Sequence, residues 1–343
     1  MREDPPAPRH GPVQGTALSW RRVGGTRSFY LQGARAGRAL LAARAVAAQH
    51  GVRCEQARVL QDGVNVVVHL APAPVVARVA TLTPLLRPTP LRSFAREVAV
   101  AGALAAAGAP VVPPSDVLPP GPHRYAGLEL SFWRYAEVLP VAPSPADVAA
   151  ALPELHGYLA ALPVDGAPLD TPLDDLVRFA SLGRAWGAPP AHLDRLRDRL
   201  VELRPRLGGE VQPLHGDAHP GNLLATPDGW RWTDLEDTCA GPRAWDLACL
   251  RSTSRLDGRA ALDALPDAPT DAELAPWLEL RRLHAAAWRT VFAAGHPERR
   301  AAPLRVEGPR PPHPSPAQGG ALDGAVAGGG GVLHQTSGNA GSR

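Results

Sequence analysis

Two short segments in the second half of the chain carry side chains that could act together on a phosphate group. Residues 215–224 read HGDAHPGNLL, and residues 230–237 read WRWTDLED. Phosphoryl transfer requires a carboxylate that orients the acceptor hydroxyl and takes its proton, together with oxygen ligands for magnesium ions that bridge the phosphates. Asp217 suits the first role, and Asn222 and Asp234 suit the second.

The residues between these segments predict how the three side chains come together. Leu223-Leu224 and Trp230-Arg231-Trp232 flank Pro227-Asp228-Gly229, a pattern typical of a short hairpin. Such a hairpin would return Asp234 to the side of Asn222. The spacing therefore predicts one converging set of oxygen-bearing side chains.

HGDAHPGN followed by TDLED resembles the catalytic and metal-binding segments of the aminoglycoside phosphotransferase family, which is related to the protein kinases. The resemblance implies that His215 is the loop histidine and Asp217 the catalytic base. It implies that Asn222 and Asp234 are the magnesium ligands. The expected fold is then an α+β, two-lobed protein-kinase-like fold with a small sheet-based lobe and a mainly helical lobe.

Two further segments resemble the same family. Residues 241–248, GPRAWDLA, resemble the element in which an aspartate at the head of a helix, here Asp246, braces the catalytic loop. Leu155-His156 resembles a leucine-histidine pair on the first long helix of the larger lobe, where we interpret His156 as a hydrogen-bonded structural residue. The resemblance extends over about residues 55 to 250, more than half of the chain.

The basic residue expected to contact phosphate lies nearer the start of the chain. Residues 75–79, VVARV, resemble the strand that carries this residue, with Arg78 where lysine is usual. The chain contains no lysine, and arginine can bind phosphate through two parallel hydrogen bonds. The resemblance also implies that Glu97 pairs with Arg78 and holds it in position.

Two other parts of the nucleotide site are predicted less directly. Residues 61–65, QDGVN, contain one glycine where a protein kinase would show G-x-G-x-x-G, and they form the candidate phosphate-covering hairpin that includes Asn65. Residues 132–137 would be the hinge at which adenine docks through backbone groups. The donor is expected to be ATP or GTP with Mg²⁺.

Periodicity divides the chain into four parts. Residues 1–35 and the low-complexity tail 303–343 are expected to be poorly ordered. Residues 36–135 predict the nucleotide-binding lobe, and residues 136–302 predict the helical lobe with the catalytic loop and the acceptor pocket. The elements expected are helices over 36–49 and 94–107, strands over 64–70, 75–80 and 127–135, and helices beginning near residues 144, 171 and 270, with another around 193–203.

Composition excludes several other classes of protein. The net charge of +3 is small, and arginines alternate with acidic residues, so nucleic acid is not an expected partner. No signal-peptide core or long apolar stretch is visible, which favours a cytoplasmic protein without a membrane partner. Cys54, Cys239 and Cys249 lack metal-ligand spacing and are expected to be packing residues.

Alternatives stay open for the reaction and for several residues. A metal-dependent hydrolase could use His215, Asp217 and His219 as ligands, and a nucleotide-binding pseudokinase could share the same fold. Glu236 and Asp237 could attract a cationic substrate, help to bind a second metal or cap a turn.

The acceptor is expected to be a small hydroxylated molecule such as an aminoglycoside, an amino-alcohol or a sugar. Residues 160–210 and 250–300 are expected to build its pocket. Their acidic residues are compatible with an amine-bearing acceptor, namely Asp170, Asp174, Asp175, Glu202, Asp257, Asp263 and Asp267.

Overall fold

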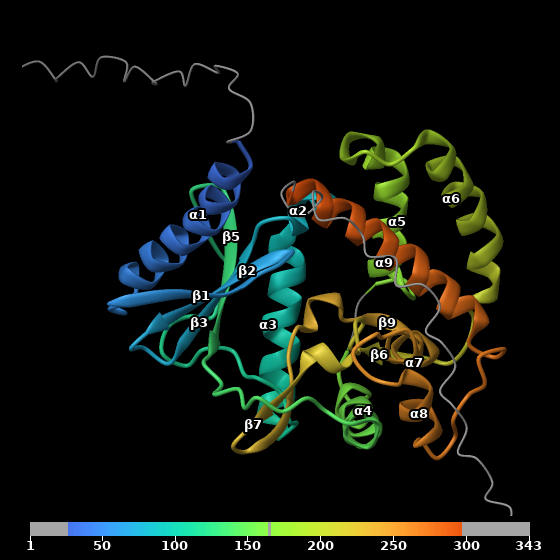
Figure 1. Ribbon diagram of the computed structural model, residues 1–343. Helices are drawn as coiled ribbons and strands as arrows, with labels where there is room; N and C mark the ends of the chain where they lie inside the picture. The colour runs from blue at the N-terminus through green and yellow to red at the C-terminus, as the bar shows by residue number, and fades with distance from the viewer. Residues whose placement is uncertain (1–26, 164–165, 297–343) are drawn as a thin grey trace, which may run out of the picture. The chain divides into compact units, whose positions relative to one another are not determined.

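The computed structural model describes residues 27–163 and 166–296. An antiparallel sheet with its helices comes first in the chain, and a mainly helical part follows it (Figure 1). This arrangement confirms the predicted α+β, two-lobed protein-kinase-like fold. The predictions of poor order for residues 1–26 and 303–343 concern segments outside the described residues.

The sheet has five strands in the order β1-β2-β3-β5-β4, and each neighbouring pair is antiparallel. The strands predicted over 64–70, 75–80 and 127–135 are confirmed within one residue at either end. The edge strands β1 and β4 were not predicted. The strands are β1 (Gln56–Asp62), β2 (Asn65–Ala71), β3 (Val75–Ala80), β4 (His123–Tyr125) and β5 (Leu128–Arg134).

The two faces of this sheet serve different purposes because successive side chains of a strand point to opposite sides. Val66 and Ala77 pack with α1 (Arg27–Gln49) in one core cluster. Val67, Val76 and Arg78, on the alternate positions, line a cavity on the other face. Figure 1 shows α1 and α3 (Pro90–Ala106) on opposite sides of the sheet.

Helix α1 begins at Arg27, earlier than the predicted start at Ala36. The helix therefore includes residues 27–35, which the sequence prediction assigned to the N-terminal extension. Between Arg27 and Arg35 the sequence contains no proline and only Gly33, so nothing there ends a helix that tertiary packing stabilises further along.

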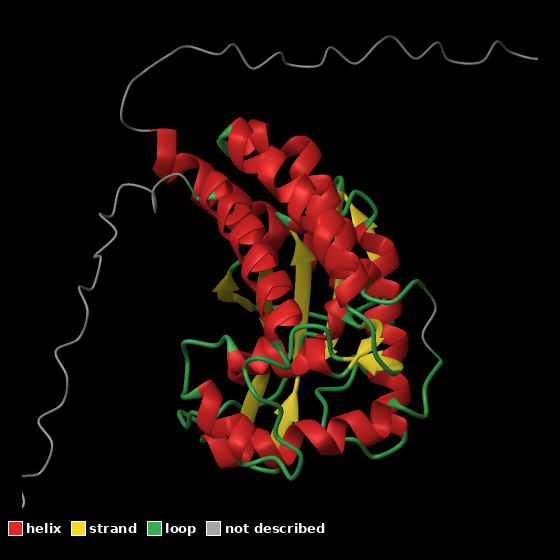
Figure 2. Ribbon diagram, turned by 90° about the vertical axis from the view of Figure 1, so that its right-hand side faces the viewer, coloured by secondary structure: helices red, strands yellow, loops and turns green. Residues whose placement is uncertain are grey.

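The remainder of the described chain is mainly helical (Figure 2). The predicted start at Ser144 is confirmed, because Ser144 and Asp147 form a reciprocal capping box at the head of the first helix. Thr270 and Glu273 form the same arrangement just before the last helix. The helices are α4 (Pro145–Leu159), α5 (Asp170–Leu182), α6 (Pro190–Leu203), α7 (Ala244–Arg251), α8 (Gly258–Asp263) and α9 (Ala275–Gly295). Among the described residues, no helix has the length and apolar character needed to span a membrane.

Short strands and turns carry the residues on which the functional interpretation depends. Strands β7 (Leu223–Thr226) and β8 (Gly229–Trp232) form the predicted hairpin. Strands β6 (Val211–Leu214) and β9 (Cys239–Pro242) pair with each other. The loop with residues 215–222 follows β6, and the one-turn helix η4 (Leu235–Asp237) follows Asp234.

Candidate active site

The loop after β6 is held in shape by a buried carboxylate. Asp246, near the start of α7, accepts hydrogen bonds from the backbone N–H groups of His215 at 2.9 Å and Gly216 at 2.8 Å. The Nε2 atom of His156 lies 2.9 Å from Oδ2 of the same carboxylate. Asp246 therefore lies against the backbone of the loop, where the sequence predicts it. His156 is buried beside it and forms a structural hydrogen bond.

Gly216 allows this loop to lie against the turn that follows Asp234. Its φ of +88° is in the left-handed region that glycine favours. A Cβ atom at this position would lie 2.0 Å from the carbonyl oxygen of Asp237, which no side chain could tolerate. The glycine in the HGD sequence is therefore required by a close approach of two backbones.

His215 links the loop to the neighbouring hairpin through its ring. Its Nε2 atom lies 3.1 Å from the carbonyl oxygen of Thr233, and its Nδ1 atom accepts a hydrogen bond from the backbone N–H of Asp217 at 3.3 Å. Both ring nitrogens thus contact backbone groups. In the described residues no group of three or more His, Cys, Asp or Glu side chains is arranged to hold a metal, so the hydrolase site of His215, Asp217 and His219 is not supported.

Asp217 lies between two cationic or potentially cationic side chains. Its Oδ1 atom is 2.7 Å from Nη2 of Arg281 on α9, and its Oδ2 atom is 3.4 Å from Nε2 of His219. Burial alone would raise the pKa of Asp217, but the Arg281 charge and the His219 hydrogen bond outweigh it. The pKa of Asp217 therefore lies well below its ordinary value, and the carboxylate is ionised.

Asn222 and Asp234 lie at the two ends of the hairpin and line the same cavity as Asp217. The side-chain amide of Asn222 donates to the carbonyl oxygen of Asp217 at 3.0 Å, which leaves the Oδ1 atom of Asn222 as an acceptor. The backbone carbonyl of Asn222 accepts from the N–H of Thr233 at 2.9 Å. Asp234 adopts a left-handed conformation with φ of 66°, which aspartate tolerates better than most residues.

Arg78 joins the strand β3 to both α3 and the hairpin. Its Nη1 atom is 2.6 Å from Oε1 of Glu97, and its Nη2 atom is 2.5 Å from Oδ1 of Asp234 and 3.0 Å from Oε2 of Glu236. Burial would lower the pKa of Arg78, but these carboxylates, led by Asp234, raise it. The guanidinium therefore stays charged. The predicted pairing of Arg78 with Glu97 is present in the structure.

Asn65 lies at the start of β2, beside the same carboxylates. Its side-chain N–H donates to Oε2 of Glu236 at 3.0 Å, and its Oδ1 atom accepts from the hydroxyl of Thr83 at 2.7 Å. Asn65 lines the cavity and is 7% exposed. The structure thus places it in the site, with Glu236 as its immediate partner.

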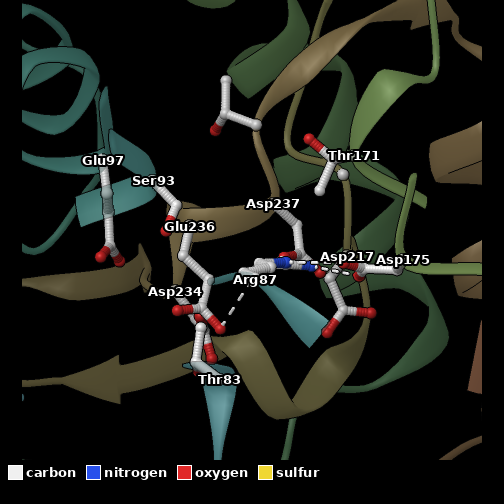
Figure 3. Close-up of polar contacts among 12 residues, drawn as sticks. Thr83, Arg87, Ser93, Glu97, Thr171, Asp175, Asp217, Asp234, Glu236 and Asp237 are labelled. Atoms are coloured by element: carbon white, nitrogen blue, oxygen red, sulfur yellow. Dashed lines mark hydrogen bonds and ion pairs between the residues drawn. The ribbon is translucent and has the colours of Figure 1, made fainter. Parts of the chain in front are cut away.

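Arg87 is a part of the site that the sequence analysis missed. It follows α2 (Thr83–Leu86) and forms two hydrogen bonds with Asp175 on α5, at 3.1 Å from Nε and 2.7 Å from Nη2. Its Nη1 atom lies 2.5 Å from Oδ1 of Asp237 and 3.9 Å from Oε1 of Glu236. Figure 3 shows Arg87 between Glu236 and Asp175. No motif marks this residue, because its partners come from distant parts of the chain.

Acidic side chains outnumber basic ones around Arg78 and Arg87. Five carboxyl groups contact these two guanidinium groups, so like charges lie close together there. Burial and the like charges of Glu236 and Asp234 raise the pKa of Glu97 against the pull of Arg78. A divalent cation would offset this repulsion, and the carboxylate and amide oxygens of Asp234 and Asn222 are ligands that suit Mg²⁺.

These residues surround a cavity of about 970 Å³, which is large enough for a nucleotide and a small acceptor. Trp133, Arg134, Tyr135 and Ala136 from the predicted hinge line one part of it. Several side chains of α9 between Arg281 and Ala293 line another part, whereas none of the described residues within 160–210 does. The acceptor pocket expected from residues 160–210 therefore does not coincide with this cavity, because the apolar side chains of α5 and α6 pack in a core cluster with Leu280, Ala287 and Val291 of α9.

Many solved structures share this fold, and three of them illustrate the similarity. Choline kinase LicA from Streptococcus pneumoniae is 16% identical with a TM-score of 0.52, and the match covers 76% of this chain and 90% of that chain. An aminoglycoside-3'-phosphotransferase of type VIII is 19% identical with a TM-score of 0.51, covering 71% and 97%. APH(2")-IIia in complex with GDP and kanamycin is 14% identical with a TM-score of 0.51, covering 76% and 95%. No curated protein matches the sequence.

The family model that matches is that of the phosphotransferase enzyme family, APH, and the match runs over residues 20–283. This range is well over half of the chain and includes the strand with Arg78, the loop with Asp217 and the hairpin that leads to Asp234. The resemblance seen in the HGDAHPGN and TDLED segments is confirmed. The chain belongs to the phosphotransferase enzyme family.

Proposed function

We propose that the chain transfers the γ-phosphoryl group of ATP or GTP to a hydroxyl group of a small molecule. The observation that carries the proposal is that Asp217, Asn222, Asp234 and Arg78 all line one cavity. A base, two oxygen ligands for a metal and a cation for the phosphates are the groups that this reaction needs. The GDP and kanamycin in the complex of one relative in fold agree with a nucleotide and an acceptor sharing such a site.

The nucleotide would be held by groups from both sides of the cavity. Asn222 and Asp234 would hold Mg²⁺, which would supply positive charge to offset the negative charge of the phosphates. Arg78 would donate hydrogen bonds to phosphate oxygens while Glu97, buried at 1% exposure, fixes its position. Asn65 would orient Glu236 beside this group through its 3.0 Å hydrogen bond.

Asp217 would receive the hydrogen bond of the acceptor hydroxyl and, during transfer, its proton. Because the pKa of Asp217 lies well below its ordinary value, the carboxylate is ionised at neutral pH and is a weak base. A weak base suits a loose transition state, in which the hydroxyl needs alignment more than early removal of its proton. Asp246 would keep the loop that carries Asp217 in shape.

Magnesium-dependent nucleotide binding tests this proposal. We expect the wild-type chain to bind ATP or GTP at least tenfold more tightly with Mg²⁺ than with EDTA, as measured by calorimetry. Asp234→Asn should remove most of this difference, because an amide is a weaker magnesium ligand than a carboxylate. Asp228→Asn, in the exposed turn of the same hairpin, should retain it. Equal nucleotide affinity with and without Mg²⁺ in the wild-type chain would contradict the proposal.

A further inference from the structure

A second hollow lies next to the cavity that contains Asp217 and shares several lining residues with it. Its volume is about 500 Å³, which suits a small molecule. His219, Arg255, Arg281 and Arg289 line both spaces. A molecule in this hollow would therefore lie next to the carboxylate that we assign to the acceptor hydroxyl.

The lining of this hollow is strongly basic. Arg281, Arg282 and Arg289 come from α9, Arg255 comes from the segment between α7 and α8, and residues 252–254 add three side-chain hydroxyls. No aspartate or glutamate is among its described lining residues. Anionic oxygens match these donors, because the guanidinium groups and the hydroxyls of Thr253 and Ser254 can donate hydrogen bonds to them, whereas Ser252 already donates to the carbonyl oxygen of Ala248.

Three of the four guanidinium groups have no ion-pair partner among the described residues. The side chains of Arg255, Arg282 and Arg289 form no hydrogen bond or ion pair there, although Arg255 packs closely on the loop. A Cβ atom on Gly221 would lie 2.8 Å from Nε of Arg255. Grouping like charges without counterions costs free energy, and a bound anion would recover it.

The spacing on α9 explains how the hollow receives these side chains. Arg281, Ala285 and Arg289 are four residues apart, so they lie on one face of the helix and point toward the same space. His284 and Trp288, one position earlier than Ala285 and Arg289, line the nucleotide cavity instead. One helix thus supplies side chains to both spaces.

Arg281 connects the basic hollow to the reacting group. Its Nη2 atom lies 2.7 Å from Oδ1 of Asp217, so any acceptor hydroxyl that reaches Asp217 must lie beside this guanidinium. A positively charged amine close to that hydroxyl would meet Arg281 and Arg255 as like charges. A carboxylate or phosphate group at the same place would instead pair with them.

The acidic residues that were compatible with an amine-bearing acceptor lie elsewhere. Asp175 is paired with Arg87 inside the helical part, Asp257 caps α8, and Asp263 pairs with Arg259. None of the seven lines either space. The expectation that these residues recognise an amine is therefore not supported by their positions.

We propose that the acceptor is a small hydroxylated anion whose carboxylate or phosphate group binds Arg281, Arg255, Arg282 and Arg289. This inference rests on the proposed phosphotransferase function. The acceptor oxygen forms a bond to the γ-phosphorus, the bond from that phosphorus to the β-phosphate bridging oxygen breaks, and the nucleoside diphosphate leaves with the electron pair. The hydroxyl proton passes to Asp217. Choline, which is part of the name of the choline kinase LicA, is a cation and so has the opposite charge to the acceptor proposed here.

A matched panel of acceptors tests the charge preference. Glycerate, glyceramide and 3-amino-1,2-propanediol share a hydroxylated three-carbon frame and are anionic, neutral and cationic, and glycerol 3-phosphate distinguishes phosphate from carboxylate. Nucleoside diphosphate formation with Mg²⁺ and ATP or GTP gives kcat/KM for each compound. We expect an anionic member to exceed its neutral and cationic counterparts by roughly 10- to 100-fold, the range for a hydrogen bond to a charged group. A faster cationic or neutral member would overturn the inference.

Binding decides the question even if every panel member is a poor substrate. The same compounds are titrated into wild-type chain saturated with Mg²⁺ and AMP-PNP, with Trp288 in the cavity as a fluorescent reporter. The anionic members should bind at least tenfold more tightly than the cationic one. Equal or weaker anion binding would overturn the inference. Lack of Mg²⁺-dependent nucleotide binding would instead contradict the proposed phosphotransferase function itself, so the two failures can be told apart.

Variants on the outer part of α9 locate the anion. The double variant Arg282→Gln/Arg289→Gln changes two exposed side chains and should raise KM for the best anionic acceptor roughly tenfold, with kcat little changed. Arg195→Gln, on the exposed side of α6, should behave as wild type. Wild-type affinity for the acceptor should also fall as salt rises. Unchanged KM in a double variant with normal thermal unfolding would contradict this assignment.

Discussion

Arg87 and Asp175 form a two-bonded ion pair that joins the segment after β3 to α5. Nε and Nη2 of the guanidinium each contact one carboxylate oxygen, at 3.1 and 2.7 Å. Asp175 is 2% exposed, and its Oδ2 atom is also 3.0 Å from His284 Nε2 and accepts from Trp288 at 3.0 Å. This cluster ties α9, which carries Arg281, to the segment that follows β3.

The first prediction concerns the stability that this pair provides. Asp175→Asn should lower the free energy of unfolding by about 3–5 kcal/mol at neutral pH, because it leaves Arg87 buried with one carboxylate fewer. Urea unfolding followed by circular dichroism measures this change. Asp174→Asn, the exposed neighbour on the same helix, should change it by less than about 0.5 kcal/mol.

The second prediction gives the pH dependence of the same effect. Burial alone would raise the pKa of Asp175, but the Arg87 charge and the His284 hydrogen bond outweigh it and hold the pKa well below its ordinary value. A group with a lowered pKa in the folded state stabilises the fold above its unfolded pKa, about 3.9 for aspartate. The stability difference between wild type and Asp175→Asn should be constant from pH 5 to 7 and shrink below about pH 4. A difference that grows on acidification would contradict this assignment.

The third prediction concerns the coupling between Arg78 and Glu97. Arg78→Lys should weaken nucleotide binding about tenfold, because a single ammonium cannot hold Glu97 and Asp234 through separate nitrogens as Arg78 does. Glu97→Gln should weaken it by a similar factor. Calorimetry on both variants and on the double variant should show losses that are not additive. Additive losses would mean that Glu97 does not position Arg78.

The fourth prediction concerns the carboxylate that braces the catalytic loop. Asp246→Asn should lower the free energy of unfolding by about 2 kcal/mol, because an amide offers one acceptor oxygen where the carboxylate serves two backbone N–H groups. It should also lower kcat while leaving KM for nucleotide nearly unchanged. Steady-state kinetics and thermal unfolding measure the two effects, with Asp228→Asn as the control. A stable variant with wild-type kcat would show that the loop does not depend on Asp246.

Much of the site could be predicted because its residues are close in the sequence. Asp217, Asn222 and Asp234 lie within 18 residues, and the hairpin between them is encoded by its own turn residues. Asp246 follows only a short distance later. Local spacing therefore carries most of the information about which carboxylates meet.

Arg87 and Arg281 could not be predicted, because their roles depend on partners far along the chain. Arg87 is 88 residues from Asp175, and Arg281 reaches Asp217 only through the path of α9 across the cavity. Strand β1 was missed for another reason. Its residues are mostly exposed at a sheet edge, so the strand lacks the apolar alternation that marks a half-buried strand. Tertiary packing, rather than local pattern, places these parts.

The role of Asp217 is the central claim, and a single substitution tests it most directly. Asp217→Asn removes the proton acceptor but retains the shape of the side chain. We expect transfer of the γ-phosphoryl group, measured in single-turnover experiments with the best acceptor, to fall about 1,000-fold, while nucleotide affinity changes by less than about threefold. Asp217→Asn protein that binds nucleotide normally and transfers phosphate at the wild-type rate would contradict the account.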